Sequence, residues 1–481
     1  MQKFDLIIIG GGAGAFAAAI KANELTAKTA LINSGLPLGG TCVNVGCVPS
    51  KTLLWAGEIM HSAGHHGVPG IELERRQFNF QTVIKDELAL VEKLRTEKYE
   101  KVLKSLENVT FIDGKARFVS KNELAVISAD NPEPRRVQGQ GFIIATGSTA
   151  TAPPVEGMNE AGYITHVEAL KLDRLPKSMV VVGAGPVGLE FAQMYARFGT
   201  TVTLLQRGPR IFPQGEPELT DRLTDILRNE DITVITDAEV KQARKSGEQK
   251  TLVYEVSNPA SAKATAGKQE VTADELLLAT GKTPNTRELE LDSAGVKVDE
   301  RQAVVVNPTF TTSQPHILAV GDVTNLPLRL ETTAGREGTL AAENILTGSQ
   351  HTIDYATVPH TIFTDPQLAG VGLTEEQEMS KLGRCACRTV SFADVPKGLI
   401  THRTEGAIKM AIHPDTNEIM GVHILAPNAG DLIAQAMVLI KNKNTIDDVT
   451  SSMPVFPTMS EAIKIVALSF TQDISKLSCC V

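Results

Sequence analysis

The sequence predicts an α/β protein with two Rossmann-like nucleotide-binding domains and a C-terminal α+β domain. Three observations lead to this prediction. The order strand, glycine-rich turn, helix, strand occurs twice, about 170 residues apart. An Ala-Thr-Gly segment follows each occurrence. After about residue 350, strand-like and helix-like segments alternate without further glycine turns of this kind.

Length and composition set broad limits on the class of protein. The chain has 481 residues, of which 42% are hydrophobic and 21% charged, as in globular proteins of about three domains. The net charge of -9 weighs against a nucleic-acid partner, which would need a basic surface. Six cysteines in a chain of this length do not indicate a secreted disulfide framework.

The first predicted unit begins with the buried-strand pattern FDLIIIG and continues into the turn GGGAGA, a helical segment and the strand KTALIN. In this turn Gly10 permits the sharp bend, and Gly12 lets the backbone approach a pyrophosphate. Gly14 lies in the same turn. Ala15 occupies the third fingerprint position, where a small residue still lets helix and strand pack closely.

The second predicted unit is SMVVVGAGPVGLEFAQMYARFGTTVTLLQR, which has the full G-x-G-x-x-G spacing at Gly183, Gly185 and Gly188. One such motif is weak evidence, because glycine turns are common. Two motifs, each between a predicted strand and helix, indicate two phosphate-binding helix N-termini and an internal repeat.

Three further segments predict how the domains follow one another. FIIATGS contains Thr146 and Gly147, ELLLATGKTPN contains Gly281, and the buried strand HILAVGD ends at Asp322. We expect the chain to leave the first domain, form the second and return to the first. The predicted boundaries are 1–150 and 275–345 for the first domain, 151–274 for the second, and 350–481 for the α+β domain, whose simplest role is subunit pairing.

The segment GGTCVNVGCVPSK contains two cysteines, Cys42 and Cys47, in a tight turn that leads into a helix. Two buried core cysteines are one interpretation, and a zinc half-site is another, although no second ligand pair lies nearby. The third is a redox-active dithiol. Cys47 would lie near a helix N-terminus, with Pro49 close to the first helical position and Lys51 adding positive charge, which favours a thiolate.

These segments together resemble the pyridine nucleotide–disulfide oxidoreductase family, and the resemblance covers essentially the whole chain. It implies an FAD domain, an NAD(P)H domain and a C-terminal dimerisation domain. The resemblance implies that FAD is bound by the first glycine turn and by segments near it: Gly10, Gly12, Gly14, Ala15, Asn33, Gly40, Thr41, Lys51, Thr146, Gly147 and Asp322. The nicotinamide cofactor would be bound by Gly183, Gly185, Gly188, Gln206, Arg207, Arg210 and Gly281.

The resemblance also implies catalytic roles. Cys42 would exchange with the substrate, and Cys47 would lie against the flavin in a charge-transfer complex. Lys51 and Glu190 would lie near the flavin. One departure is Asn33, which stands where the family usually has an acidic residue for the adenosine ribose; an amide can still hydrogen-bond a hydroxyl.

The residues after the second unit's second strand favour NADPH over NADH. An acidic residue there would bind the free 2′-hydroxyl of NADH. The sequence instead has Gln206, Arg207 and Arg210, which leave no carboxylate to repel a 2′-phosphate and provide two guanidinium groups that can pair with it.

The segment MPVFPTMSEA bears on which substrate the protein reduces. Disulfide reductases of the family carry a histidine before the Pro-Thr pair, and a glutamate orients it so that it protonates the leaving thiol. Here Phe456 stands in the place of that histidine, while Glu461 is retained. Phenylalanine cannot transfer a proton, so we expect poor reduction of lipoamide or glutathione disulfide.

The C-terminal sequence LSCCV places two adjacent thiols, Cys479 and Cys480, at the end of the chain. Together with Phe456, they resemble the mercuric reductase branch of the family. Hg(II) is soft and prefers thiolates. We therefore expect a metal path from Cys479 and Cys480 to Cys42 and Cys47, supplied by an Hg(II)–thiol complex and completed across a homodimer whose active site is shared between subunits.

Alternatives remain open. The tail could be an incidental cysteine pair, or a dithiol that reduces another oxidised partner, which would make the protein a disulfide reductase with an unusual substrate. A flavoprotein that only sequesters metal has no need of the second glycine turn. The mercuric reductase branch often has tyrosine where Phe456 stands. Cys385 and Cys387 are expected to be neighbours on a strand or loop without further ligands, an auxiliary metal site being the alternative.

The two ends of the chain bear on location and on additional domains. Asp5 interrupts the N-terminal apolar run, which argues against a signal peptide, and no run reaches the ~18 apolar residues of a membrane span. We expect a cytoplasmic protein without a membrane span. Because the sequence starts at the first strand, we also expect no N-terminal metal-binding domain.

Overall fold

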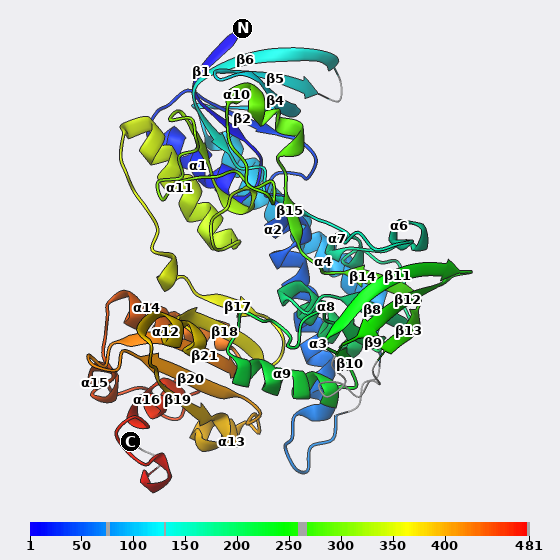
Figure 1. Cartoon of the computed structure of the whole chain (residues 1–481), viewed down its shortest axis with the longest axis vertical. Coiled ribbons are helices and arrows are strands. Elements are labelled where there is room, and N and C mark those ends of the chain that lie inside the picture. Colours follow the sequence, from blue (N-terminus) through cyan, green and yellow to red (C-terminus); the bar gives the residue numbers. More distant parts are fainter. Residues whose placement is uncertain (74–76, 129–130, 258–266, 479–481) are drawn as a thin grey trace. The chain divides into compact units, whose positions relative to one another are not determined.

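The protein contains two compact units, each built from several segments of the chain. The structure, a computed structural model, describes residues 1–73, 77–128, 131–257 and 267–478 (Figure 1). Unit 1 comprises Met1–Thr52, Ile84–Thr151 and Gly281–Tyr355; unit 2 comprises Leu53–Val83, Ala152–Thr280 and Ala356–Val481. None of the helices in the described residues combines the length and hydropathy needed to cross a bilayer.

The main sheet of unit 1 has the order β3-β2-β1-β6-β5-β4, with β16 beside β6. The strands β3, β2, β1, β6 and β16 pair in parallel, whereas β5 and β4 extend the sheet by antiparallel pairs. The bounds are β1 Gln2–Ile9, β2 Thr29–Asn33, β3 Val109–Asp113, β4 Lys115–Ser120, β5 Glu123–Ser128, β6 Asn131–Ile144 and β16 Ile317–Ala319, and a separate ribbon pairs β7 Ser148–Ala150 with β15 Lys282–Pro284.

Helices cover this sheet, and α1 and α11 lie side by side on it (Figure 1). Their contact is close because two glycines meet there: a Cβ atom on Gly338 would lie 2.0 Å from the carbonyl oxygen of Gly14. The helical bounds are α1 Ala13–Glu24, α2 Gly40–Val45, η1 Thr96–Glu100, α5 Lys101–Ser105, η3 Arg287–Leu289, α10 Leu291–Ala294, η4 Gly321–Val323 and α11 Glu331–Thr347. Helices α3 Cys47–His65 and α4 Phe80–Arg95 contain residues of both units.

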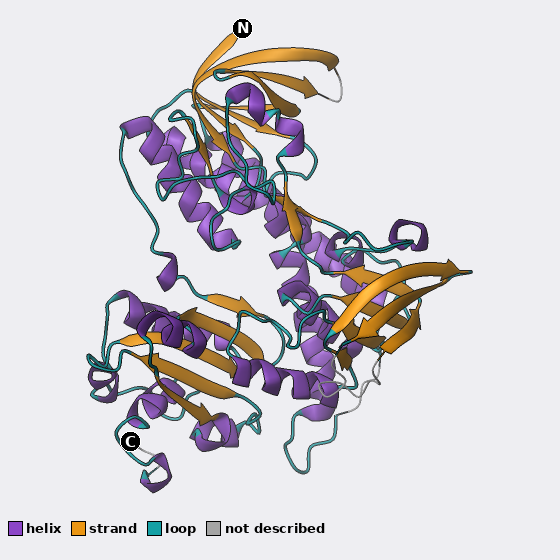
Figure 2. Cartoon of the chain, viewed as in Figure 1, coloured by secondary structure: helices purple, strands orange, loops and turns teal. Residues whose placement is uncertain are grey.

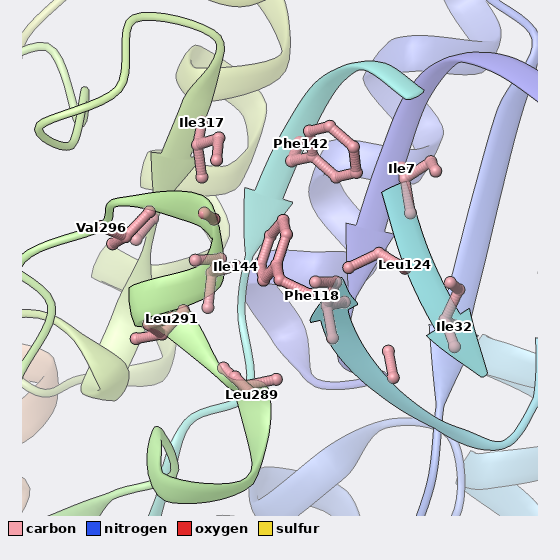
Figure 3. Close-up of a cluster of buried hydrophobic side chains, with 14 of the residues drawn as sticks. Ile7, Ile32, Phe118, Leu124, Phe142, Ile144, Leu289, Leu291, Val296 and Ile317 are labelled. Carbon is pink, nitrogen blue, oxygen red and sulfur yellow. The ribbon is translucent and has the colours of Figure 1, made fainter. Parts of the chain in front are cut away.

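Apolar side chains fill both faces of the unit 1 sheet, as expected for parallel strands with uninterrupted hydrophobic runs. Figure 3 shows one face, where Phe118 and Phe142 pack with Ile144 against Leu289 and Leu291. The rings of Phe118 and Phe142 are 5.4 Å apart. This core fixes the carboxyl ends of β1 and β6, from which the glycine turn and the Ala-Thr-Gly segment emerge.

Unit 2 contains a second parallel sheet in the order β10-β9-β8-β14 and a three-stranded meander, β11-β12-β13. Helix α8 begins with Pro186 and ends at Phe198, and the next residue, Gly199, terminates it with a positive φ of 108°. The bounds are β8 Ser178–Val182, β9 Thr201–Leu205, β10 Thr233–Ile235, β11 Ala238–Ser246, β12 Gln249–Val256, β13 Gly267–Ala273, β14 Glu275–Leu278, α6 Met158–Ala161, α7 His166–Ala169, α8 Pro186–Phe198 and α9 Pro217–Asn229.

After residue 355, unit 2 forms a five-stranded antiparallel sheet in the order β17-β18-β21-β20-β19, covered by helices (Figure 2). Helix α14 packs on β18 and β21, and α16 packs on β19 and β20. The bounds are β17 His360–Ile362, β18 Gln367–Gly372, β19 Ala386–Ser391, β20 Ala407–Ile412, β21 Ile419–Ala426, α12 Glu375–Leu382, α13 Pro396–Ile400, α14 Ala429–Lys441, α15 Ile446–Thr450 and α16 Glu461–Leu468. The predicted fold class, two parallel-sheet glycine-turn folds and a C-terminal α+β fold, is confirmed.

Candidate functional site

The first glycine turn is built by close backbone approaches. Gly10 has a φ of 128°, and a Cβ atom on it would lie 2.2 Å from the carbonyl oxygen of Ala145. Gly12 is the N-cap of α1, so the free N–H groups of the first helical turn point toward this position. A cofactor phosphate there would be held by backbone N–H groups and by the helix dipole.

A cavity of about 850 Å³ opens beside this turn, entirely within unit 1. Its size suits a dinucleotide rather than a small metabolite. Among the predicted FAD-binding residues, the cavity is lined by Gly10, Gly12, Asn33, Gly40, Thr41, Thr146 and Gly147. The site therefore fits an adenine dinucleotide whose pyrophosphate crosses the N-terminus of α1.

Two predicted residues shape the wall of the cavity next to the turn. Asn33 is the last residue of β2, and its Nδ2 donates to the carbonyl oxygen of Leu36 at 2.9 Å. Its amide lies 2.6 Å from where a Cβ atom on Gly11 would be, so a side chain at residue 11 would displace the Asn33 amide. Gly40, with a φ of 57°, packs in turn against the backbone of Gly12.

The two segments that follow the strands are joined by hydrogen bonds that sequence patterns did not indicate. The Thr146 hydroxyl donates to the carbonyl oxygen of Asn285, and Asn285 Nδ2 donates back to the carbonyl oxygen of Thr146 at 2.9 Å. Ser148, which lines the cavity, donates to Asp322 Oδ2 at 2.8 Å. This bond holds the Asp322 carboxylate beside the cavity.

The remaining predicted FAD residues lie around this cavity without lining it. Gly14 and Ala15 belong to α1, where Ala15 is fully buried and Gly14 contacts α11. Gly281, predicted for the nicotinamide cofactor, belongs to unit 1 and has a φ of 120°; its carbonyl oxygen accepts from Thr151 N–H.

The two cysteines of the predicted dithiol lie in consecutive helices, α2 and α3, and both belong to unit 1. Cys42 is half-buried in α2, and Cys47 is the exposed first residue of α3. The placement of Cys47 at a helix start, with Pro49 in the first turn, follows the prediction. The two side chains are hydrogen-bonded thiols rather than a disulfide.

The charge environment of Cys42 favours the protonated thiol. Its pKa is raised, first by the hydrogen bond with Cys47 and then by burial, and the carboxylate of Glu331 acts in the same direction. Lys51 opposes them and lowers the pKa of Cys42, as its predicted place beside the pair requires. Burial, and after it the electrostatic effects of Cys42 and Glu331, also raise the pKa of the Tyr99 phenol to about 12.

Asn44, between the two cysteines, fixes their loop and was not singled out by the sequence. It is 6% exposed, and its Nδ2 is within hydrogen-bonding distance of the carbonyl oxygens of Pro37, Leu38 and Gly40 at 2.8–3.1 Å. Its Oδ1 accepts from Arg95 Nη1 at 3.4 Å. Its position between the two cysteines could have marked Asn44 as important in the sequence, but only the fold shows which groups it contacts.

The second glycine turn lies in unit 2 and repeats the first. Gly183 has a φ of 102°, and a Cβ atom on it would lie 2.5 Å from the carbonyl oxygen of Ala279. Gly185 is the N-cap of α8. A Cβ atom on Gly188 would lie 1.8 Å from the carbonyl oxygen of Gly183, so this position has no room for a side chain.

The three polar residues after β9 lie at the end of this turn. Gln206 Oε1 accepts from the Ala184 N–H at 3.1 Å, so the amide closes the turn. Arg207 is exposed, and Arg210 is half-exposed, with Nε 3.6 Å from the Asp221 carboxylate. An exposed ion pair of this kind contributes about 0–1 kcal/mol, so Arg210 can exchange it for a phosphate.

Other predicted catalytic residues also lie in unit 2. Glu190 is buried in α8, and its Oε1 accepts from the Phe363 N–H at 2.9 Å. Phe456 is 45% exposed, and Glu461, the first residue of α16, accepts from the Thr458 N–H at 3.0 Å. Lys51 belongs to unit 1, whereas Glu190, Phe456 and Glu461 belong to unit 2. Cys479 and Cys480 lie outside the described residues.

Comparison with family models identifies two regions of the chain. Residues 4–338 match the model described as pyridine nucleotide-disulphide oxidoreductase. Residues 358–467 match the dimerisation domain of the same family.

Curated relatives match over nearly the whole chain. A mercuric reductase from Streptomyces lividans is 39% identical over 478 residues, 99% of this chain and 98% of the relative. A mercuric reductase from Staphylococcus aureus is 36% identical over 477 residues, 99% of this chain and 84% of the relative.

Solved structures show the same fold. The HOCl-induced flavoprotein disulfide reductase RclA from Escherichia coli, in a Cu(II) complex, matches with a TM-score of 0.85 and 26% identity, covering 98% of this chain and 100% of that chain. With two glycine turns, a dithiol at a helix start and full-length relatives of this kind, the chain belongs to the pyridine nucleotide-disulphide oxidoreductase family.

Proposed function

We propose that this protein is an FAD-dependent enzyme that uses NADPH to reduce Hg(II) to Hg(0). The observation that carries the proposal is a dithiol, Cys42 and Cys47, in a chain whose C-terminal segment has Phe456 where a disulfide reductase of the family needs a proton donor. Relatives named mercuric reductase, similar along the whole chain, support the same substrate.

The overall reaction balances without a side-chain acid at position 456. A mercury bis-thiolate, NADPH and one proton give Hg(0), NADP⁺ and two thiols. The metal gains two electrons and NADPH loses two, and both Hg–S bonds break. When bound, the flavin supplies the two-electron link between the nicotinamide and the metal. No sulfur–sulfur bond breaks, so loss of the histidine at position 456 removes nothing that this reaction requires.

The residues of the chain bind and orient the reactants. Cys42 and Cys47 are the two soft ligands that Hg(II) prefers. Asn44 keeps this segment in place through the contacts of its Nδ2 with the surrounding backbone carbonyl oxygens. Cys479 and Cys480 receive Hg(II) from a thiol complex in solution and pass it inward by ligand exchange.

The nicotinamide partner in this proposal is NADPH. Gln206 closes the second glycine turn with its amide instead of a carboxylate, so no negative charge opposes a 2′-phosphate. Arg207 and Arg210 follow Gln206 in the sequence, and their guanidinium groups supply the positive charge that a 2′-phosphate needs. The location in this proposal is the cytoplasm, because the reaction consumes NADPH and the cytoplasm supplies it.

The working form in this proposal is a homodimer whose active site is shared between the subunits. In unit 2, Met453 is 95% exposed and Val455 is 75% exposed, close in sequence to Phe456. Exposed apolar side chains that occur together in this way suit burial in a subunit interface.

The test measures NADPH oxidation by the purified flavoprotein with Hg(II) supplied as a dithiol complex. Wild type is compared with C479A/C480A, and C385A/C387A provides a control of equal cysteine loss. We expect mercury-dependent turnover that falls at least tenfold in C479A/C480A and is kept in the control. If NADPH reduces the bound FAD but Hg(II) causes no NADPH oxidation, the proposal is rejected.

A disulfide reductase is the second candidate, because RclA, described as a flavoprotein disulfide reductase, shares the fold over the whole chain. The same assay separates the two: disulfide-dependent NADPH oxidation without metal selects this candidate. Tight Hg(II) binding with no NADPH consumption under either condition would instead indicate a protein that sequesters the metal.

A further inference from the structure

Two cysteines outside the dithiol lie in the C-terminal fold of unit 2 and have no role in the proposed reaction. Cys387 lies in β19, and Cys385 comes two residues earlier. Residues two apart on an extended segment project from the same face. Helix α12 contains Glu375 and Glu378, three residues apart and therefore on one helical face.

The fold brings these two faces together. Cys385 Sγ lies 3.5 Å from Glu375 Oε1, and Cys387 Sγ lies 3.5 Å from Glu378 Oε2. Ligand atoms of Glu375, Cys385 and Cys387 all lie within 4.8 Å of one another. Adjacent sulfur and oxygen ligands of a tetrahedral Zn²⁺ ion are roughly 3.6 Å apart, given Zn–S of about 2.3 Å and Zn–O of about 2.1 Å. Glu375 and Glu378 are candidate ligands beside the cysteines that the sequence did not indicate.

A buried carboxylate oxygen supplies an independent observation. Glu378 is 0% exposed, and its Oε1 has no hydrogen-bond partner among the described residues. The Cys387 thiol satisfies only the other oxygen, Oε2. Leaving a buried polar atom without a partner costs about 1–3 kcal/mol, and a cation coordinated by this oxygen would remove that cost.

The neighbouring charges suit a divalent ion. Lys409, 7% exposed, forms ion pairs with Glu375 and with Glu216, at 3.2 Å in the second case. Lys409 offsets part of the negative charge that these carboxylates bring to the pocket.

We propose that Cys385, Cys387, Glu375 and Glu378 form a second metal site, which binds a divalent d¹⁰ ion of the Zn²⁺ class. Two thiolates and two carboxylates are a ligand set that Zn²⁺ accepts in tetrahedral geometry, whereas Mg²⁺ and Ca²⁺ require oxygen ligands alone. Binding replaces the two thiol protons, which pass to solvent. No electron transfer is involved.

The test titrates Zn²⁺ into the full-length flavoprotein in competition with a chromophoric chelator. Wild type is compared with C385A/C387A, in which the dithiol and the tail cysteines are unchanged. We expect the variant to bind one equivalent of Zn²⁺ per chain fewer than wild type. Equal stoichiometry and affinity in the two proteins would overturn the proposal.

A milder pair of variants tests the same site without deleting the thiols. Glu378→Gln removes the buried carboxylate, and Glu376→Gln removes an exposed carboxylate of the same helix. We expect E378Q to weaken the binding of that one equivalent at least tenfold, and E376Q to leave it unchanged. This comparison decides the matter if the double cysteine variant does not fold. Equal affinity in E378Q and E376Q would reject the site.

Activity keeps this inference separate from the proposed function. Because the four ligands lie outside the proposed metal path, C385A/C387A and E378Q should keep the NADPH oxidation rate of wild type with Hg(II). If C385A/C387A binds one Zn²⁺ per chain fewer than wild type and keeps its turnover with Hg(II), the second site is supported. This holds whatever the outcome of the tail-cysteine experiment.

Discussion

The glycine turns of unit 1 and unit 2 share a backbone framework. Gly10 N–H donates to the Ile32 carbonyl at 2.7 Å, and Gly183 N–H donates to the Leu205 carbonyl at 2.8 Å. In each unit the first glycine has a positive φ and lies against the alanine that begins an Ala-Thr-Gly segment. The repeated motif therefore reflects repeated backbone contacts.

The turns differ at the third fingerprint position. Ala15 is fully buried in unit 1, whereas Gly188 in unit 2 has no room even for a Cβ atom, which would lie 1.8 Å from the Gly183 carbonyl oxygen. In unit 1 the tightest helix contact is instead at Gly14, against Gly338 of α11. The closest approach is thus within the turn in unit 2, and between α1 and α11 in unit 1.

The units agree where the ends of their second strands meet the glycine turns. Asn33 and Gln206 follow equivalent buried strand residues, Ile32 and Leu205, and each amide lies against its glycine turn. An acidic residue is common at both places in dinucleotide folds. The amides let the turn keep a hydrogen-bonding group without adding negative charge beside a cofactor.

The largest effect is expected from alanine at the first glycine of each turn. G10A and G183A each force a side chain into a left-handed backbone and against a carbonyl oxygen, at a local cost of about 3 kcal/mol. We expect G10A to bind FAD at least 100-fold more weakly than wild type. G183A should keep FAD and weaken NADPH binding to a similar degree. Flavin absorbance after gel filtration and NADPH titration measure the two effects, and simultaneous loss of both cofactors in either variant would contradict the comparison.

Acid should weaken unit 2 through a buried histidine. Burial, with the nearby charge of His423, lowers the pKa of His360 from 6.5 to about 4. The unfolded chain then binds the proton more tightly than the folded chain, so stability falls as pH drops below 6.5. The loss is about 2 kcal/mol by pH 5 and reaches about 3 kcal/mol near pH 4.

Thermal unfolding of wild type and H360N at pH 7 and pH 5 measures this contribution. The asparagine does not titrate, so we expect the unfolding temperature of H360N to fall less between the two pH values than that of wild type. Equal decreases would show that protonation of His360 does not limit unit 2.

Cofactor preference should respond to the amide in unit 2 and not to the amide in unit 1. Gln206→Glu keeps the acceptor for the Ala184 N–H and adds a negative charge, which should lower the ratio of kcat/KM for NADPH to that for NADH about tenfold, or ~1.4 kcal/mol. Asn33→Asp is the matched control and should leave the ratio unchanged. A ratio that moves equally in both variants would mean that the assignment of the two turns is wrong.

The smallest effect is expected at Ala15. Ala15→Gly leaves the backbone free to adopt the same turn but lowers the helical preference of α1, at about 1 kcal/mol. Thermal unfolding should show a small decrease with FAD content unchanged. Loss of FAD in this variant would show that the Ala15 methyl group takes part in the site and does more than fill space beside the helix.

Local sequence determined the elements of this protein. FDLIIIG and SMVVVG are apolar runs bounded by glycines, and such runs form buried strands wherever they occur. Asn33 and Gln206 at strand ends, and Cys47 at a helix start, followed from the same short-range patterns. Steric limits and hydrogen bonding within a few residues decide these features, so a reader of the sequence can place them.

Only the tertiary structure decided which distant residues meet. The Ser148–Asp322 bond joins residues 174 apart in the chain, and α12 brings Glu375 and Glu378 to Cys385 and Cys387. Asn44 was visible between the cysteines, but its bond to Arg95 was not. Such contacts depend on how whole elements pack to bury their apolar faces, and a periodic pattern specifies which face is buried without specifying its partner.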